Sequence, residues 1–196
     1  MSACDPKRTS PNGLSPCAHI HPAATVVTML INPTLPTTSV EMRDVQDAAR
    51  NLGIEISVLK ASTESEIDTA FASIAKQRVD GLFVGTDPFL LGQRDQIVRS
   101  AAFHNIPTTY FLREFVAAGG LMSYGPNIAN GYQQAGIYTG RVLNGDKPAD
   151  LLVIQPTKFE LVINQKTAKA LGLTMPQTLL VAADEGSNRG AVRCAA

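Results

Sequence analysis

Two acidic side chains, Asp87 and Glu114, follow short apolar runs of the sequence and are candidates for chemistry. Two carboxyl groups held close together can act as a general acid and a general base. No histidine or cysteine follows an apolar run, so a nucleophilic triad cannot be completed there. The sequence also has no G-x-S-x-G elbow, no Walker loop and no G-x-G-x-x-G after its first run. These absences weaken an enzymatic interpretation without excluding it, and we assign no catalytic residue.

Polar side chains follow the other apolar runs as well. In an open parallel α/β sheet, ligands bind beyond the carboxyl ends of the strands, where the loops converge. Carboxylates at that edge can pair with an ammonium group, and hydroxyl and N–H groups can hold a carboxylate, so the edge suits a small polar or zwitterionic molecule. For Asp87 and Thr63, helix N-capping is the alternative role. The candidate ligand contacts are Asn32, Thr34, Ser62, Thr86, Asp87 and Glu114, with Arg113 less firmly among them.

The elements that would position these residues form a repeat. Apolar runs begin near Val26, Ile54, Gly81 and Pro107, so they recur every 26 to 28 residues. That spacing accommodates one strand, one helix and two loops, and it predicts a Rossmann-like parallel sheet with helices on both faces.

Helix signals lie between the runs. Thr38-x-x-Glu41 and Thr63-x-x-Glu66 both fit a capping box, in which a hydroxyl and a carboxylate satisfy free N–H groups of the first turn. Apolar residues at helical spacing follow each box. A third helix is predicted over residues 92–104. We therefore expect four βα units between Val26 and Glu114.

Composition excludes several classes of protein. The 196 residues include 17 basic and 17 acidic side chains, so no net charge attracts nucleic acid. No run approaches the roughly 18 apolar residues of a membrane-spanning helix. The N-terminus lacks the layout of a signal peptide, so we expect the chain as written to be cytoplasmic. The cysteines, Cys4, Cys17 and Cys194, lie near the ends, and we interpret Cys17 to His21 as tail residues rather than a metal site.

After Glu114 the regular spacing of the apolar runs ends. A run "GLMSYG" precedes a predicted helix over residues 128–143, and "FELVI" precedes a short helix opened by Asn164. The last segment, "EGSNRGAVRCAA", has no periodicity, and we expect residues 185–196, like residues 1–24, to be disordered or unrelated tails.

Three motifs of this second half, "SYG", "NGDKPAD" and "FELVINQKTAKALGL", form a specific combination. With them, residues 25–184 resemble the C-terminal part of the substrate-binding proteins of ABC importers, and within these the group related to tryptophan- and other aromatic amino-acid-binding lipoproteins. The resemblance implies a non-catalytic periplasmic protein that clamps a solute between two α/β lobes and delivers it to a transporter permease, without a cofactor.

The resemblance also implies a hinge between the lobes. The chain would cross it near residues 117–120, where Gly119 and Gly120 give backbone freedom, with Gly125 following. Residues 117–150 would then belong to the first lobe. Tyr124 would begin the far side of the cleft and offer its ring and hydroxyl to the ligand. The alternative for Tyr124 is a core tyrosine beside a plain loop.

A family member should carry about a hundred further residues that form the first lobe. Residues 1–24 do not resemble such a lobe, and we therefore expect residues 25–184 to correspond to one lobe of the two-lobe fold. Without its partner sheet, the helix over residues 128–143 would expose or re-bury its apolar face, which consists of Ile137, Tyr138, Val142 and Leu143. Self-association through this face is the expected consequence.

Two other functions remain as alternatives. The effector-sensing half of a sugar-repressor-like regulator shares the two-lobe plan, but no helix-turn-helix or basic N-terminal module is present. A small flavodoxin-like enzyme or phospho-acceptor domain would use Asp87 as acid or acceptor. Such phospho-acceptor domains need an acidic cluster after the first strand, where this chain has "NPTLPT".

Overall fold

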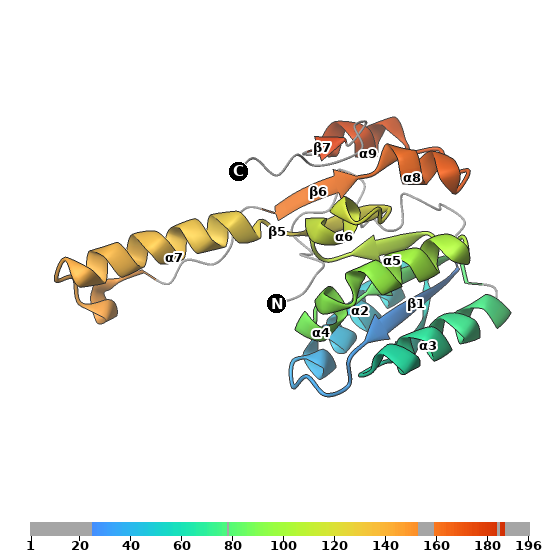
Figure 1. Ribbon diagram of the computed structural model, residues 1–196, viewed down its shortest axis with the longest axis horizontal. Coiled ribbons are helices and arrows are strands. Elements are labelled where there is room, and N and C mark those ends of the chain that lie inside the picture. Colours follow the sequence, from blue (N-terminus) through green and yellow to red (C-terminus); the bar gives the residue numbers. More distant parts are fainter. Residues whose placement is uncertain (1–24, 78, 153–158, 184, 187–196) are drawn as a thin grey trace.

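The first half of the chain consists of parallel strands separated by helices, as the repeat of apolar runs predicts. The computed structural model describes residues 25–77, 79–152, 159–183 and 185–186 (Figure 1). The proposed Cys17-to-His21 stretch and most of both tails lie outside these residues. The elements are β1 (Val26–Ile31), α2 (Thr38–Leu52), β2 (Glu55–Lys60), α3 (Glu64–Lys76), β3 (Gly81–Val84), α4 (Pro88–Gly92), α5 (Arg94–Phe103) and β4 (Thr108–Tyr110).

The second half extends the same sheet. Its elements are α6 (Arg113–Ala117), β5 (Met122–Pro126), α7 (Ile128–Leu143), a 3-10 turn (Pro148–Asp150), β6 (Phe159–Ile163), α8 (Gln165–Ala170), α9 (Gln177–Ala182) and β7 (Glu185–Gly186). Among the described residues the sheet has seven strands in the order β2-β1-β3-β4-β5-β6-β7. Only the β5–β6 pairing is antiparallel.

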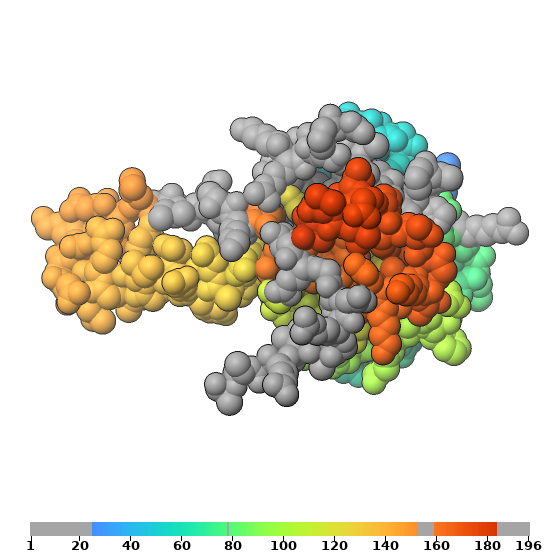
Figure 2. Space-filling model, turned by 90° about the horizontal axis from the view of Figure 1, so that it is seen from above, coloured from blue at the N-terminus to red at the C-terminus, as the bar shows by residue number. Residues whose placement is uncertain are grey.

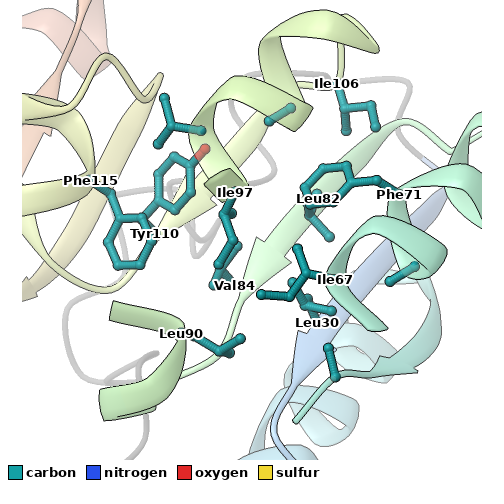
Figure 3. Packing of buried hydrophobic residues seen from close by; sticks show 14 of the residues in the cluster. Leu30, Ile67, Phe71, Leu82, Val84, Leu90, Ile97, Ile106, Tyr110 and Phe115 are labelled. Atoms are coloured by element: carbon teal, nitrogen blue, oxygen red, sulfur yellow. The ribbon is translucent and has the colours of Figure 1, made fainter. Parts of the chain in front are cut away.

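Helices cover both faces of the sheet, as predicted. On β1, Leu30 points to one face, where it packs with residues of α3, α4 and α5 (Figure 3). Its neighbours Met29 and Ile31 point to the other face, where α2 packs. The largest cluster also includes Ile67, Phe71, Leu82, Val84, Leu90, Ile97, Ile106, Tyr110 and Phe115 (Figure 3).

A smaller core lies under α8 and α9. Leu121, Met122 and Leu161 of the sheet region are buried there against Ala168 and Leu179 of these helices. The strands on the far side of β4 therefore have a core of their own within this lobe.

The two predicted capping boxes have different outcomes. Thr63 accepts a hydrogen bond from the backbone N–H of Glu66, and the Glu66 carboxylate accepts one from that of Ser62, so α3 is capped much as predicted. The prediction of the first capping box, Thr38-x-x-Glu41, is wrong. Thr38 instead donates to the carbonyl of Asn32, and Glu41 points to the loop after β3. Tertiary hydrogen bonds replace local capping there.

The sequence predicts that the chain leaves this lobe at residues 117–120, so that the next strand would belong to the first lobe. That prediction is wrong for β5, which belongs to the sheet of this lobe. Met122 and Ser123 of β5 pair in parallel with β4. Thr167 of α8 donates to the carbonyl of Gly119 at 2.8 Å, which fixes the turn before β5. The chain leaves the sheet only after Pro126.

The glycines predicted for the hinge have a steric role. A side chain at Gly120 would approach the Tyr110 ring to 2.6 Å, and one at Gly125 would lie 1.8 Å from the Phe111 carbonyl. Gly119 has a φ of +107°, which favours glycine. At Gly120 and Gly125, close packing within the lobe is therefore the structural reason for glycine.

Helix α7 extends away from the sheet as an arm (Figure 1, and from a second direction Figure 2). It contains no buried residue. Tyr132 and Leu143 are 76% and 81% exposed. An amphipathic helix gains most of its stability from packing its apolar face, so α7 lacks the contacts that its sequence suits.

Two smaller differences concern element boundaries. The predicted helix over residues 92–104 is α5, and α4 precedes it after the cap at Asp87. Residues 185–186, expected in a tail, form β7 beside β6.

Two general features also emerge from the part of the chain that the structure describes. Each of its helices is too short or too polar to traverse a bilayer. It contains no group of three or more His, Cys, Asp or Glu side chains arranged to hold a metal ion.

Candidate functional site

The candidate residues lie along one edge of the sheet, where the parallel strands end. The order of strands reverses there, since β1 lies between β2 and β3 although it precedes both. Loops after β1 and β3 diverge at such a switch point, and ligands of open α/β sheets bind beside it. The loop after β1 contributes Asn32, and the loop after β3 contributes Thr86 and Asp87.

Asn32 and Asp87 connect these two loops. The Asn32 amide donates to one carboxylate oxygen of Asp87 at 3.2 Å, and both side chains are buried. The other oxygen of Asp87 accepts from the N–H of Leu90 at 2.9 Å, which caps α4. Asn32 also accepts from the N–H and the hydroxyl of Thr34. Asp87 thus has the capping role, and the pair organises the switch point.

Glu41 also belongs to this region, although the sequence predicts that it forms part of a helix capping box with Thr38. Its Oε1 accepts a hydrogen bond from the N–H of Thr86 at 2.9 Å, and the residue is only 8% exposed. Burial raises the pKa of the Glu41 carboxyl above its ordinary value of 4.5, while the hydrogen bonds from Thr86 oppose that shift and the nearby Asp87 adds to it. Two carboxyl groups therefore lie close to the switch point.

The remaining predicted contacts are more exposed. Thr34 and Thr86 lie at the surface, and Ser62 is half-buried with its N–H and hydroxyl directed to Glu66. Glu114 is exposed on α6. Asp87 and Glu114 therefore occupy different environments, and the buried Asp87 carboxylate is engaged in structural hydrogen bonds.

A second polar group lies at the carboxyl ends of β4 and β5. Oε2 of Glu160 accepts from the Arg113 guanidinium at 3.4 Å and from the Asn127 amide at 3.1 Å. Glu160 is 9% exposed. Arg113 was expected at this edge from the sequence, whereas Glu160 was not, because "FELVI" was interpreted as a strand without a site residue.

Tyr124 lies beside this group on β5. It is half-buried, and its ring stacks on Phe159 of β6 with centroids 5.8 Å apart. The neighbouring Gly125 pairs with Glu160 in the ladder. Because β5 and β6 are antiparallel, the end of one and the beginning of the other meet at the same edge as the switch point.

The edge as a whole is suited to binding. It presents carboxylates, a guanidinium, amides and hydroxyls along successive strand ends, and such groups hold polar ligands by charge-assisted hydrogen bonds. Among the described residues, these groups form no nucleophile–base pair with a hydrogen bond in place. Ion pairing and hydrogen bonding are what this arrangement offers a ligand.

Comparison with known proteins gives a family and a fold. The model of the family "ABC transporter substrate binding protein" matches residues 15–187. A curated relative, the tyrosine-binding protein of Clostridioides difficile (strain R20291), is 25% identical over 152 residues, which are 78% of this chain and 44% of the relative.

Two solved structures have the same fold. A conserved domain protein from Vibrio cholerae has a TM-score of 0.78 and 23% identity, over 86% of this chain and 56% of that protein. An ABC domain from Streptococcus pneumonia in complex with L-Trp has a TM-score of 0.77 and 23% identity, over 85% and 58%. This chain spans about half the length of each relative.

Proposed function

The chain belongs to the family of ABC transporter substrate-binding proteins, and we propose that it is the solute-binding part of an importer. The family match over residues 15–187 carries this proposal. The polar edge of the sheet supports it, because charged groups lie at several strand ends along this edge, where ligands of open α/β sheets bind. Binding without catalysis is the corresponding mechanism.

We propose an amino acid as the solute, held in a cleft between two lobes. One relative is named a tyrosine-binding protein and a protein of the same fold was solved with L-Trp. The exposed candidate contacts fit both ends of a zwitterion: Glu114 for the ammonium group, and Thr34 and Thr86 for the carboxylate. Asp87, whose two oxygens are bound by Asn32 and Leu90, holds the loop that carries Thr86. Asn32, Ser62 and Tyr124 complete the proposed contacts.

The described lobe is proposed to be the second of two. The chain spans about half the length of each relative, which supports this proposal. Helix α7 also supports it, because the helix extends from the sheet with its apolar side chains in solvent. In this interpretation α7 covers the sheet of the first lobe. The described lobe taken by itself encloses a ligand on one side only, which gives weak affinity, and it exposes α7 for self-association.

The proposed partner is the permease of the transporter. Substrate-binding proteins of this family are typically periplasmic or otherwise extracytoplasmic. We propose that location for the assembled protein, in preference to the cytoplasm. The balanced charge of the chain gives no support to a nucleic-acid partner.

A thermal-shift screen against amino acids, sugars and nucleotides tests the proposal. A ligand that binds the folded state raises the melting temperature, and the stabilisation grows with the logarithm of the ligand concentration divided by Kd. We expect stabilisation by an amino acid, and its loss in Glu114→Gln, whose exposed side chain can be changed without disturbing the core. Glu64→Gln is the matched control on α3. Stabilisation by a nucleotide or flavin alone would favour the flavodoxin-like alternative.

A further inference from the structure

The root of α7 is held by hydrogen bonds to a single carboxylate oxygen. Asn127 is the N-cap of α7 and the point at which the chain leaves β5. Glu160 lies on β6, next to the point at which the chain re-enters the sheet. Oε2 of Glu160 accepts from the Asn127 amide at 3.1 Å and from Arg113 at 3.4 Å. One buried group therefore connects the outgoing strand, the returning strand and the end of β4.

Asn127 separates two functions between its two side-chain atoms. Its carbonyl oxygen accepts from the N–H of Asn130 at 2.8 Å, which caps the helix. Its amide nitrogen is the atom that contacts Glu160. Helix formation and helix direction thus depend on different hydrogen bonds of the same residue.

The surroundings of Glu160 favour a fixed geometry. The residue opposite in the ladder is Gly125, which has no side chain to compete for the space. A carboxylate at 9% exposure is costly to leave without partners, so its bonds to Arg113 and Asn127 resist opening. The backbone at Gly125 is itself confined by the Phe111 carbonyl.

We propose that Glu160 is a positioning residue that fixes the direction in which α7 leaves the sheet. The helix has 16 residues and is about 24 Å long, so a rotation of about 10° at Asn127 displaces its far end by about 4 Å. Displacements of that size decide whether a helix packs correctly on a neighbouring lobe. The relevance to solute binding rests on the proposed function, whereas the geometry of the contacts between Glu160 and Asn127 does not.

The distance between spin labels on α7 and on the body of the lobe tests the proposal without any solute. The labels are attached at Gln133→Cys on α7 and Ala72→Cys on α3, both exposed positions, with Cys4, Cys17 and Cys194 replaced by serine. Labelled protein is diluted with unlabelled protein so that only intramolecular distances are measured. We expect a narrow distance distribution in the parent and a wider one in Asn127→Asp.

Asn127→Asp keeps the capping oxygen but places a second carboxylate against Glu160. Combining it with Glu160→Gln restores a donor and an acceptor with their roles exchanged, so the double variant should return to a narrow distribution. The proposal would be overturned if the distance distribution of the parent were already wide, or if it had the same width in the parent and in Asn127→Asp. A double variant whose distribution stays as wide as that of Asn127→Asp would also overturn it. If Asn127→Asp loses its circular dichroism, Asn127→Ser replaces it, since serine caps the helix without the amide donor; an unchanged width there also overturns the proposal. A failed solute screen leaves these outcomes unaffected.

Discussion

The backbone N–H of Thr86 donates a hydrogen bond of 2.9 Å to Oε1 of Glu41, a side chain 45 residues earlier in the sequence. This bond joins α2 to the loop after β3. Glu41 also lies close to Gly85, where a Cβ would be 3.4 Å from its other oxygen. The buried carboxyl group therefore fixes the backbone immediately before Asp87 and, with it, one side of the switch point.

The first prediction concerns the pH dependence of stability. Because burial raises the pKa of Glu41 above 4.5, the folded protein binds this proton more tightly than the unfolded chain does. The contribution of Glu41 to stability is thus fully present below pH 4.5 and is lost as the pH rises through the folded-state pKa. We expect Glu41→Gln to remove this decline. Melting temperatures measured from below pH 4.5 to neutrality should fall for the parent relative to the variant, and parallel curves would contradict the prediction.

The second prediction concerns Asp87. Asp87→Ala removes the cap of α4, worth about 1 kcal/mol, and leaves the buried Asn32 amide without its partner, which costs about 1–3 kcal/mol. We expect a loss of about 2–4 kcal/mol in the free energy of unfolding, measured by urea denaturation. Asp95→Ala, at an exposed position in the first turn of α5, is the control and should change stability by less than about 0.5 kcal/mol. Equal effects of the two substitutions would show that the Asn32–Asp87 link carries no stability.

The parallel sheet and its helices could be predicted from the sequence because period and capping are local signals. The two T-x-x-E patterns show where this reasoning ends. Both sequences permit a capping box, yet only Thr63 caps its helix, because Thr38 and Glu41 find partners in other loops. Long-range hydrogen bonds of this kind leave no trace in the spacing of residues along the chain.

The strand ends of the site were predictable for the same reason as the strands. Asn32, Thr86 and Asp87 were identified by position alone, and the structure brings them together at the switch point. Glu41 was missed because it reaches the edge from helix α2, and Glu160 was missed because it reaches the edge from the antiparallel strand β6. The location of the crossing was misjudged because two adjacent glycines permit either flexibility or close packing, and only the contact between Gly120 and Tyr110 distinguishes these.

The third prediction compares two glycines. Gly125→Ala would place a methyl group 1.8 Å from the Phe111 carbonyl oxygen, and the nearest atoms are all backbone atoms of Phe111, which cannot rotate away as a side chain can. We expect destabilisation of more than about 4 kcal/mol, visible as loss of soluble folded protein. Gly131→Ala is the matched control, since its added methyl group meets open space in α7 and should stabilise by about 0.5–1 kcal/mol. A folded Gly125→Ala protein with parental stability would contradict this prediction.

The fourth prediction concerns self-association through α7. Ile128, Tyr132 and Leu143 are separated by 4 and 11 residues, so they lie on one face of the helix, and each is at least 40% exposed. Arg141 is the one charged residue in the helix and is paired with Asp146, so little charge repulsion opposes contact between two such faces. We expect the parent to sediment faster as its concentration rises.

Introducing charge on this face should prevent the association. Tyr132→Lys combined with Leu143→Lys places two ammonium groups where apolar side chains would meet, and both side chains are already exposed, so the fold loses no core contact. Val181→Lys, at a 76% exposed position on α9, is the control for a general effect of added charge. We expect the double variant to sediment at a constant rate at every concentration and the control to behave like the parent. If all three proteins associate equally, a surface other than α7 is responsible, because only that helix has lost its apolar face in the double variant.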